Sequence, residues 1–147
     1  MKLFITDEAK QLMKNQYSLS IPNETGGILF GYYSEDLEAA TITDVFYNIE
    51  DSKGRFRSFV RGKKGLKRFS TYMWSNGKYY LGEWHTHPHS LPNMSMQDKK
   101  QMVKIKENKE FKCPEPILAI VGENNNEIII QTYIFFGDKI HCEKIAD

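Results

Sequence analysis

The chain has 147 residues, and its 40% hydrophobic and 13% aromatic content is enough to fill one hydrophobic core. The formal net charge of +1 excludes a global attraction to nucleic acid or to a membrane surface, and no apolar run approaches the ~20 residues needed to cross a bilayer. The cysteines, Cys113 and Cys142, have no C-x-x-C partner, which argues against a disulfide framework or a thiolate zinc site. We therefore expect residues 1–147 to form a single domain of a soluble, cytoplasmic protein.

The first predicted elements are a short strand over residues 2–5 and a helix that follows it. Thr6 is a good helix N-cap, and Asp7 and Glu8 fall in the first turn, where the helix dipole favours acidic residues. Apolar residues then recur at helical spacing and form one stripe, made of Ala9, Leu12, Met13 and Tyr17. This stripe predicts a helix that packs on the core and ends before Pro22.

Runs of β-branched and aromatic residues dominate the rest of the chain. Residues 27–33 and 40–47 are divided by an acidic turn and are predicted to be antiparallel neighbours. A strand near residues 56–60, a helix from Leu66 that Gly77 closes, and a strand over residues 79–87 follow. The last predicted elements are a helix over residues 96–108 and strands over residues 117–121, 128–136 and 139–145. This order predicts an α/β fold with a mixed, mostly antiparallel β-sheet flanked by about three helices.

A basic segment without acidic residues lies between Lys53 and Arg68. Its cations are Lys53, Arg55, Arg57, Arg61, Lys63, Lys64, Lys67 and Arg68. A solvated face is the simplest interpretation of such a cluster, and nucleic-acid binding is a second. Among functional interpretations we favour a docking surface for a protein substrate over a nucleic-acid partner.

His85 and His87 stand two residues apart on a predicted strand. Their side chains share one face, about 6.6 Å apart along the strand, so the two imidazoles can converge on one ion. Asp98 lies one turn inside the helix that begins near Ser95, where a short loop can fold it back over the strand end. Two imidazoles and a carboxylate suit catalytic Zn²⁺, which leaves its fourth position to water. Such a site also needs a carboxylate that moves protons, usually a glutamate from another element.

Three segments of the chain carry a more specific pattern. Residues 82–88 read GEWHTHP and residues 95–98 read SMQD, which gives H-x-H-P followed by S-x-x-D. Upstream, residues 24–31 read ETGGILFG, a glutamate followed by a glycine-containing strand. In this order the segments resemble the JAB/MPN family of metalloproteases, often called JAMM proteins. The resemblance runs from about residue 3 to about residue 136.

The resemblance implies roles for five side chains. His85, His87 and Asp98 would hold zinc, Glu24 would act as general acid and base, and Ser95 would donate a hydrogen bond to the tetrahedral oxyanion. It also implies the family's MPN fold, which is cytidine-deaminase-like. The implied reaction is hydrolysis of an amide or isopeptide bond at the C-terminal tail of a ubiquitin-like or otherwise conjugated protein.

The GEWHTHP segment is similar to the prokaryotic branch of the family. Some members of that branch remove ubiquitin-like or sulfur-carrier extensions, and others belong to antiphage CBASS operons, where they cleave a nucleotidyltransferase from its conjugate. Our working hypothesis is a deconjugating isopeptidase of the second kind. The alternatives are a non-catalytic MPN scaffold that binds partners, a processing enzyme for sulfur-carrier proteins, and a DNA-associated protein.

Simpler interpretations exist for several of these residues. Asp98 could be a first-turn acid and Ser95 merely an N-cap, and one hydroxyl has to serve two roles if Ser95 also acts on the oxyanion. His89 is predicted to be a rim residue, because Pro88 breaks the strand. The sequence also differs from many relatives in having Met94, rather than proline, directly before the serine. Trp74 and Trp84 are predicted to be core or packing aromatics, and His141 is predicted to be an ordinary edge or surface residue.

Overall fold

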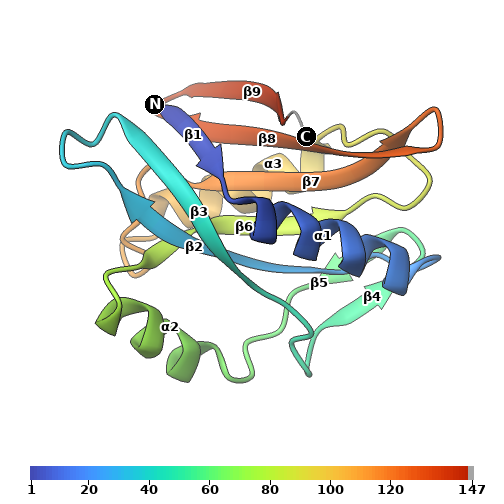
Figure 1. Ribbon diagram of the computed structural model, residues 1–147, viewed down its shortest axis with the longest axis horizontal. Helices are drawn as coiled ribbons and strands as arrows, with labels where there is room; N and C mark the ends of the chain where they lie inside the picture. Colours follow the sequence, from blue (N-terminus) through green and yellow to red (C-terminus); the bar gives the residue numbers. More distant parts are fainter. Residues whose placement is uncertain (146–147) are drawn as a thin grey trace.

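The computed structural model describes residues 1–145 and follows the predicted order of elements (Figure 1). The strands are β1 (Lys2–Ile5), β2 (Gly26–Tyr33), β3 (Ala39–Phe46), β4 (Lys53–Arg55), β5 (Ser58–Val60), β6 (Tyr79–Thr86), β7 (Ile117–Asn124), β8 (Glu127–Phe136) and β9 (Lys139–Ile145). The helices are α1 (Asp7–Ser20), α2 (Leu66–Ser75) and α3 (Met96–Glu107). Within residues 1–145, no helix is both long and apolar enough to span a membrane.

The main sheet has seven strands in the order β1-β3-β2-β6-β7-β8-β9. Neighbouring strands run antiparallel except for two parallel pairs, β1 with β3 and β6 with β7. The predicted mixed, mostly antiparallel sheet with three helices is therefore confirmed. Strands β4 and β5 form a separate hairpin, of which the sequence predicted only the second strand. Strand β4 was missed because its residues, Lys-Gly-Arg, have low strand propensity.

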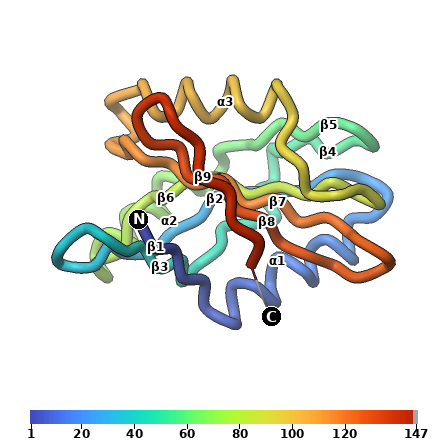
Figure 2. Tube along the Cα trace, turned by 90° about the horizontal axis from the view of Figure 1, so that it is seen from above, coloured from blue at the N-terminus to red at the C-terminus, as the bar shows by residue number. Residues whose placement is uncertain are grey.

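The helices cover both faces of the sheet (Figure 2). Helix α1 packs on one face, whereas α2 and α3 pack on the other. The predicted apolar stripe of α1 is buried at Ala9, Met13 and Tyr17, and the Thr6 hydroxyl caps the helix by accepting a hydrogen bond from the Ala9 amide. The sheet therefore separates a core beneath α1 from the space in which α3 lies.

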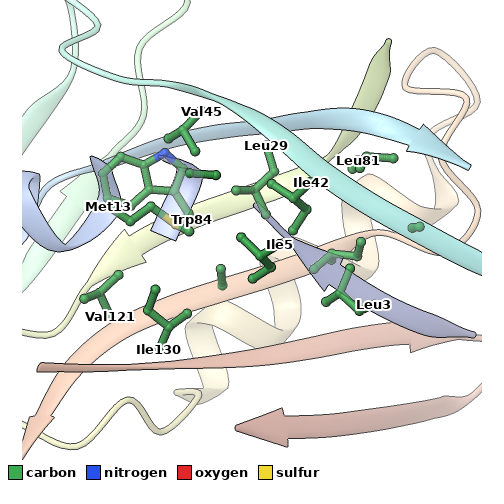
Figure 3. Close-up of a cluster of buried hydrophobic side chains, with 14 of the residues drawn as sticks. Leu3, Ile5, Met13, Leu29, Ile42, Val45, Leu81, Trp84, Val121 and Ile130 are labelled. Atoms are coloured by element: carbon green, nitrogen blue, oxygen red, sulfur yellow. The ribbon is translucent and has the colours of Figure 1, made fainter. Parts of the chain in front are cut away.

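Trp84 of β6 occupies the core beneath α1, beside Met13 (Figure 3). It is 1% exposed, and its indole N–H donates to the carbonyl of Phe46 at 3.2 Å. The packing role predicted for Trp84 is thus confirmed. Trp74 is instead 67% exposed, so a core position is wrong for it, although its ring packs edge-to-face against that of Tyr79. It follows the buried Met73 in α2, and one residue turns a helix by about 100° away from the sheet.

Tyr17 ties α1 to two segments on the far side of the core. Its hydroxyl donates to Oε1 of Glu123 at 2.6 Å and accepts the backbone amide of His89 at 2.9 Å. Burial, together with the bond to Glu123, raises the pKa of Tyr17 to about 12, so the hydroxyl keeps its proton at neutral pH. A core helix thereby holds the loop that follows β6.

Removal of this hydroxyl should destabilise the fold. We expect Tyr17→Phe to lower the free energy of unfolding by about 1–3 kcal/mol, because a hydrogen bond to a carboxylate is lost and the His89 amide loses its acceptor. Urea unfolding followed by fluorescence measures this change. Tyr72→Phe is the matched control, since Tyr72 is exposed on α2, and it should change stability by less than about 0.5 kcal/mol. Equal stability of the two variants would contradict the role of the Tyr17 hydroxyl.

Candidate metal centre

The end of β6 sends alternate side chains to opposite sides of the sheet. Trp84 and Thr86 are buried. His85 and His87 face the other way, as a period of two requires, and line a cavity together with Asp98 of α3. The structure thus brings together the three residues that the sequence singled out as metal ligands.

We call His85, His87 and Asp98 the metal cluster, since their ligand atoms all lie within 4.8 Å of one another. Nε2 of His85 is 3.2 Å from Oδ1 of Asp98, and Nε2 of His87 is 3.6 Å from Oδ2. The two Nε2 atoms are 3.2 Å apart. Tetrahedral zinc, with Zn–N bonds of about 2.05 Å, holds two nitrogens about 3.3 Å apart. The donor set and its spacing therefore fit a metal with three protein ligands.

The ionisation of the metal cluster favours a bound cation. Burial alone would raise the pKa of Asp98, but hydrogen bonds from the two histidines hold it well below its ordinary value. Burial alone would lower the pKa of His87, but the hydrogen bond to Asp98 and the charges of Asp98 and Glu24 outweigh burial and raise it. The carboxylate stays ionised in mild acid, and protons compete with a metal for His87.

Glu24 lines the cavity that contains the metal cluster. Its backbone is held from two sides, because the Glu24 amide donates to the Arg55 carbonyl of β4 at 2.8 Å and the Thr25 amide donates to the Thr86 hydroxyl at 2.9 Å. Burial raises the pKa of the Glu24 carboxyl, and the charges of the two histidines of the metal cluster offset only part of this rise. A carboxyl in this state holds a proton more readily than an exposed glutamate.

Gly26 explains how Glu24 comes so close to the metal cluster. In the β2–β6 pairing, Gly26 stands opposite His85. A Cβ atom at Gly26 would lie 2.3 Å from the carbonyl oxygen of Trp84 and 2.9 Å from both His85 Cβ and the Phe59 ring. Only glycine permits this approach, so the Glu-x-Gly spacing in the sequence corresponds to a steric requirement.

Ser95 begins α3 and forms a capping box with Asp98. Its hydroxyl oxygen accepts the Asp98 amide at 3.0 Å, and its own amide donates to Oδ2 of Asp98 at 2.9 Å. The capping box directs the carboxylate toward His87, which the same Oδ2 atom faces. Ser95 is exposed and does not line the cavity, so its donation to an oxyanion stays a prediction.

The loop before Ser95 is anchored through Met94. The Met94 amide donates to the hydroxyl of Tyr133 at 3.1 Å, and that hydroxyl donates to the carbonyl of Pro92 at 2.8 Å. A proline at position 94 could not donate this bond. The departure from many relatives at this position therefore goes with a loop that is fixed by Tyr133, and Asp98 still reaches the two histidines.

The basic segment does not form one solvated face. Arg61 is 13% exposed and pairs through Nε with Oε1 of Glu83, which is 7% exposed, at 2.5 Å. Arg57 is exposed but lines the cavity of the metal cluster, together with Ser58 and Phe59. The cluster of cations thus divides into Arg61, which forms a largely buried ion pair, Arg57, which is exposed beside the cavity, and other exposed cations that do not line it.

The remaining histidines lie outside the metal cluster. His89 is largely exposed at the rim, where Nδ1 is 3.2 Å from Oε1 of Glu123, and His141 is exposed on β9. Both positions agree with their predictions. Sequence reasoning missed Glu83, Arg61 and Thr86, which surround the site. The alternation of β6 places Glu83 on the face of His85 and could have indicated the first of these, whereas Arg61 gave no local signal.

Comparison with known proteins agrees with this geometry. The family model of prokaryotic homologs of the JAB domain matches residues 8–133. The chain is also 42% identical, over 100 residues, to a protein named CD-NTase/cGAS isopeptidase from Enterobacter hormaechei subsp. hoffmannii (strain UCI 50). That match covers 68% of this chain and 56% of the relative, so the chain spans about half the length of the curated relative it matches.

A solved structure shares the fold. The solution structure of protein DSY2949 from Desulfitobacterium hafniense matches with a TM-score of 0.73 and covers 98% of this chain and 91% of that chain. At 19% sequence identity this likeness concerns the fold alone. The sequence match and the fold together define the class of protein. The chain belongs to the family of prokaryotic homologs of the JAB domain.

The metal cluster should bind Zn²⁺, used here as a probe ion, with an affinity that falls as the pH is lowered. Zinc must displace the proton of His87, whose pKa is raised, so competition sets in as the pH falls through that pKa. A chelator-competition titration between about pH 8 and pH 5.5 measures the apparent affinity.

His85→Ala and Asp98→Ala serve as controls for the zinc titration. Each removes one of the three donors, so each should abolish stoichiometric binding across the whole pH range. Zinc affinity that is independent of pH, or stoichiometric binding by both variants, would assign the bound ion to another place on the protein.

Proposed function

We propose that this protein is a zinc-dependent isopeptidase that hydrolyses the amide bond at the C-terminal tail of a conjugated protein. The observation that carries the proposal is the convergence of the metal cluster and Glu24 on one cavity. Three protein ligands that leave one tetrahedral position open are typical of catalytic zinc, whereas structural zinc sites are closed by four. A half-buried glutamate with a raised pKa beside such a site is suited to carry protons.

In the proposed reaction, zinc when bound polarises the scissile carbonyl and lowers the pKa of the attacking water. The carboxylate of Glu24 accepts the proton of that water and passes it to the departing amine nitrogen. Burial of Glu24 supports this role, because the raised pKa makes its carboxylate a stronger proton acceptor than that of an exposed glutamate. The Ser95 hydroxyl keeps its proton free for donation, since its oxygen only accepts the Asp98 amide.

The relative named CD-NTase/cGAS isopeptidase supports a proposal for the substrate class. We infer that this chain also releases a nucleotidyltransferase of the CD-NTase type from a conjugate, as an antiphage deconjugating enzyme would. The substrate would dock partly through the exposed cations of the basic segment. Arg57 is the first candidate, because it lines both the cavity of the metal cluster and the adjoining cleft formed with Phe56 and His89.

The role of Glu24 predicts a loss of turnover without loss of metal. We expect Glu24→Gln to reduce kcat by about 10²–10⁴-fold, because the amide cannot accept and return the proton. The assay uses metal-loaded protein with a CD-NTase joined through its C-terminal carboxylate either to a lysine ε-amine or to a fusion protein. Zinc content is measured on the same samples.

Two further samples complete this experiment. His87→Ala should lose both zinc and turnover, whereas Glu24→Gln keeps stoichiometric zinc, since Glu24 is not one of the three clustered donors. Equal turnover by Glu24→Gln and the parent protein would eliminate the proposed proton transfer. Absence of zinc in the purified and reloaded parent protein would favour a non-catalytic scaffold instead.

Ser95 permits a separate test of cap and oxyanion roles. Ser95→Gly keeps the backbone amide that donates to Asp98 and lowers helix stability by only a few tenths of a kcal/mol, about as an N-cap glycine does. It removes the hydroxyl donor, so kcat should fall by about 10²–10³-fold. Ser95→Thr retains a hydroxyl and should retain most of the turnover. Full turnover by Ser95→Gly would leave Ser95 with the capping role alone.

A further inference from the structure

The hairpin made of β4 and β5 stands apart from the main sheet and borders the metal cluster. It pairs only with itself among the described strands. Its backbone nevertheless touches Glu24, because the Arg55 carbonyl accepts the Glu24 amide at 2.8 Å. Phe59 contributes to the cavity wall. The position of the hairpin therefore affects the position of Glu24.

One buried ion pair fixes the hairpin to the main sheet. Arg61 is the first residue after β5, and its Nε donates to Oε1 of Glu83 on β6 at 2.5 Å. The other carboxylate oxygen of Glu83 accepts the hydroxyl of Tyr80 at 2.5 Å, and Nη1 of Arg61 donates to the Gly62 carbonyl at 2.8 Å. Both oxygens of Glu83 are thus engaged, and both side chains of the pair line the cavity.

Stability alone gives little reason for this ion pair. Taking two charges out of water is costly, and apolar side chains of similar volume usually stabilise a fold as well or better. An ion pair with fixed donors is more directional than an apolar contact. The planar N–H donors of a guanidinium can bond a carboxylate only from certain positions. The Glu83–Arg61 pair is suited to set where the hairpin lies.

We propose that Glu83 is a positioning residue that, through Arg61, holds the β4–β5 hairpin against the backbone of Glu24 and so orients Glu24 for proton transfer. The orientation of Glu24 for catalysis rests on the proposed function, whereas the tether between β6 and the hairpin does not. The tether is the ion pair of Arg61, which lies just after β5 at one end of the hairpin. The hairpin acts on Glu24 through the hydrogen bond that the Arg55 carbonyl accepts at the other end.

Limited proteolysis tests the tether without any substrate. The exposed turn of the hairpin carries Arg57, where trypsin can cleave once the hairpin detaches from the protein. We expect Glu83→Gln and Arg61→Gln each to increase the rate of cleavage after Arg57 at least tenfold at a temperature well below the melting transition. Arg61→Lys keeps the charge but not the planar set of donors, so it should restore only part of the protection.

The matched control is Glu50→Gln, which leaves every tryptic site in place. It removes the exposed ion pair between Glu50 and Lys64, which flank the hairpin in the sequence. It should leave the cleavage rate unchanged. A cleavage rate in Glu83→Gln and Arg61→Gln equal to that of the parent protein would overturn the tether. If Glu83→Gln fails to fold, Arg61→Gln decides the question alone, because Arg61 lies outside the main sheet.

Turnover tests the effect on Glu24. With the fusion substrate described above, we expect Glu83→Gln and Arg61→Gln each to lower kcat about tenfold at unchanged zinc content, and Arg61→Lys to recover only part of that loss. The double variant should lose no more than the larger single loss, since both residues act through one link. Multiplicative losses, or full kcat in variants whose hairpin is cleaved rapidly, would overturn the positioning role. If the parent protein cleaves no substrate, the proposed function fails while the proteolysis result still decides the tether.

Discussion

The register between β2 and β6 supports the whole site. Gly26 stands opposite His85, so the segment that precedes β2 passes directly beside the metal cluster. A slip of one residue would turn every side chain of β6 to the opposite face and exchange the histidines for Trp84. A bulge near Gly82 interrupts the alternation of β6. Leu81 and Trp84, three residues apart, can therefore both reach the core beneath α1, while Glu83 and His85 face the cavity.

The core and the site therefore lie on opposite faces of the same strand, β6. Trp84 is packed beneath α1, and its close packing there constrains the backbone from which the neighbouring histidines project. Thr86 contributes from the buried side, where its hydroxyl accepts the Thr25 amide and aligns the approach to β2. Asp98 has comparable support, because α3 is anchored in a second core through Met102. A metal site with donors held this firmly loses little entropy when the ion binds.

Local patterns were sufficient for much of this arrangement. A period of two placed His85 and His87 on one face, and the N-cap signal at Ser95 placed Asp98 in the first turn of a helix. Glu24 could be assigned only from resemblance, since its position depends on a strand pairing that joins residues some sixty positions apart. The pairing of Arg61 with Glu83 could not be predicted, because in the sequence Arg61 is one of a run of cations that suggests a solvated face. The core position predicted for Trp74 was wrong for a smaller reason, since Trp74 stands one residue past the buried Met73 and the helix turns it away from the sheet.

The donors of the metal cluster and the proposed proton carrier differ in how they are held. The histidines lie at the end of a central strand, and Asp98 lies on a packed helix. Glu24 precedes its strand and depends on backbone hydrogen bonds, one of them to a hairpin outside the main sheet. Segments with few buried apolar contacts open at lower free energy than the core. Displacement of the hairpin would therefore leave the metal donors in place while Glu24 loses its alignment, so metal binding and proton transfer can change independently within one cavity.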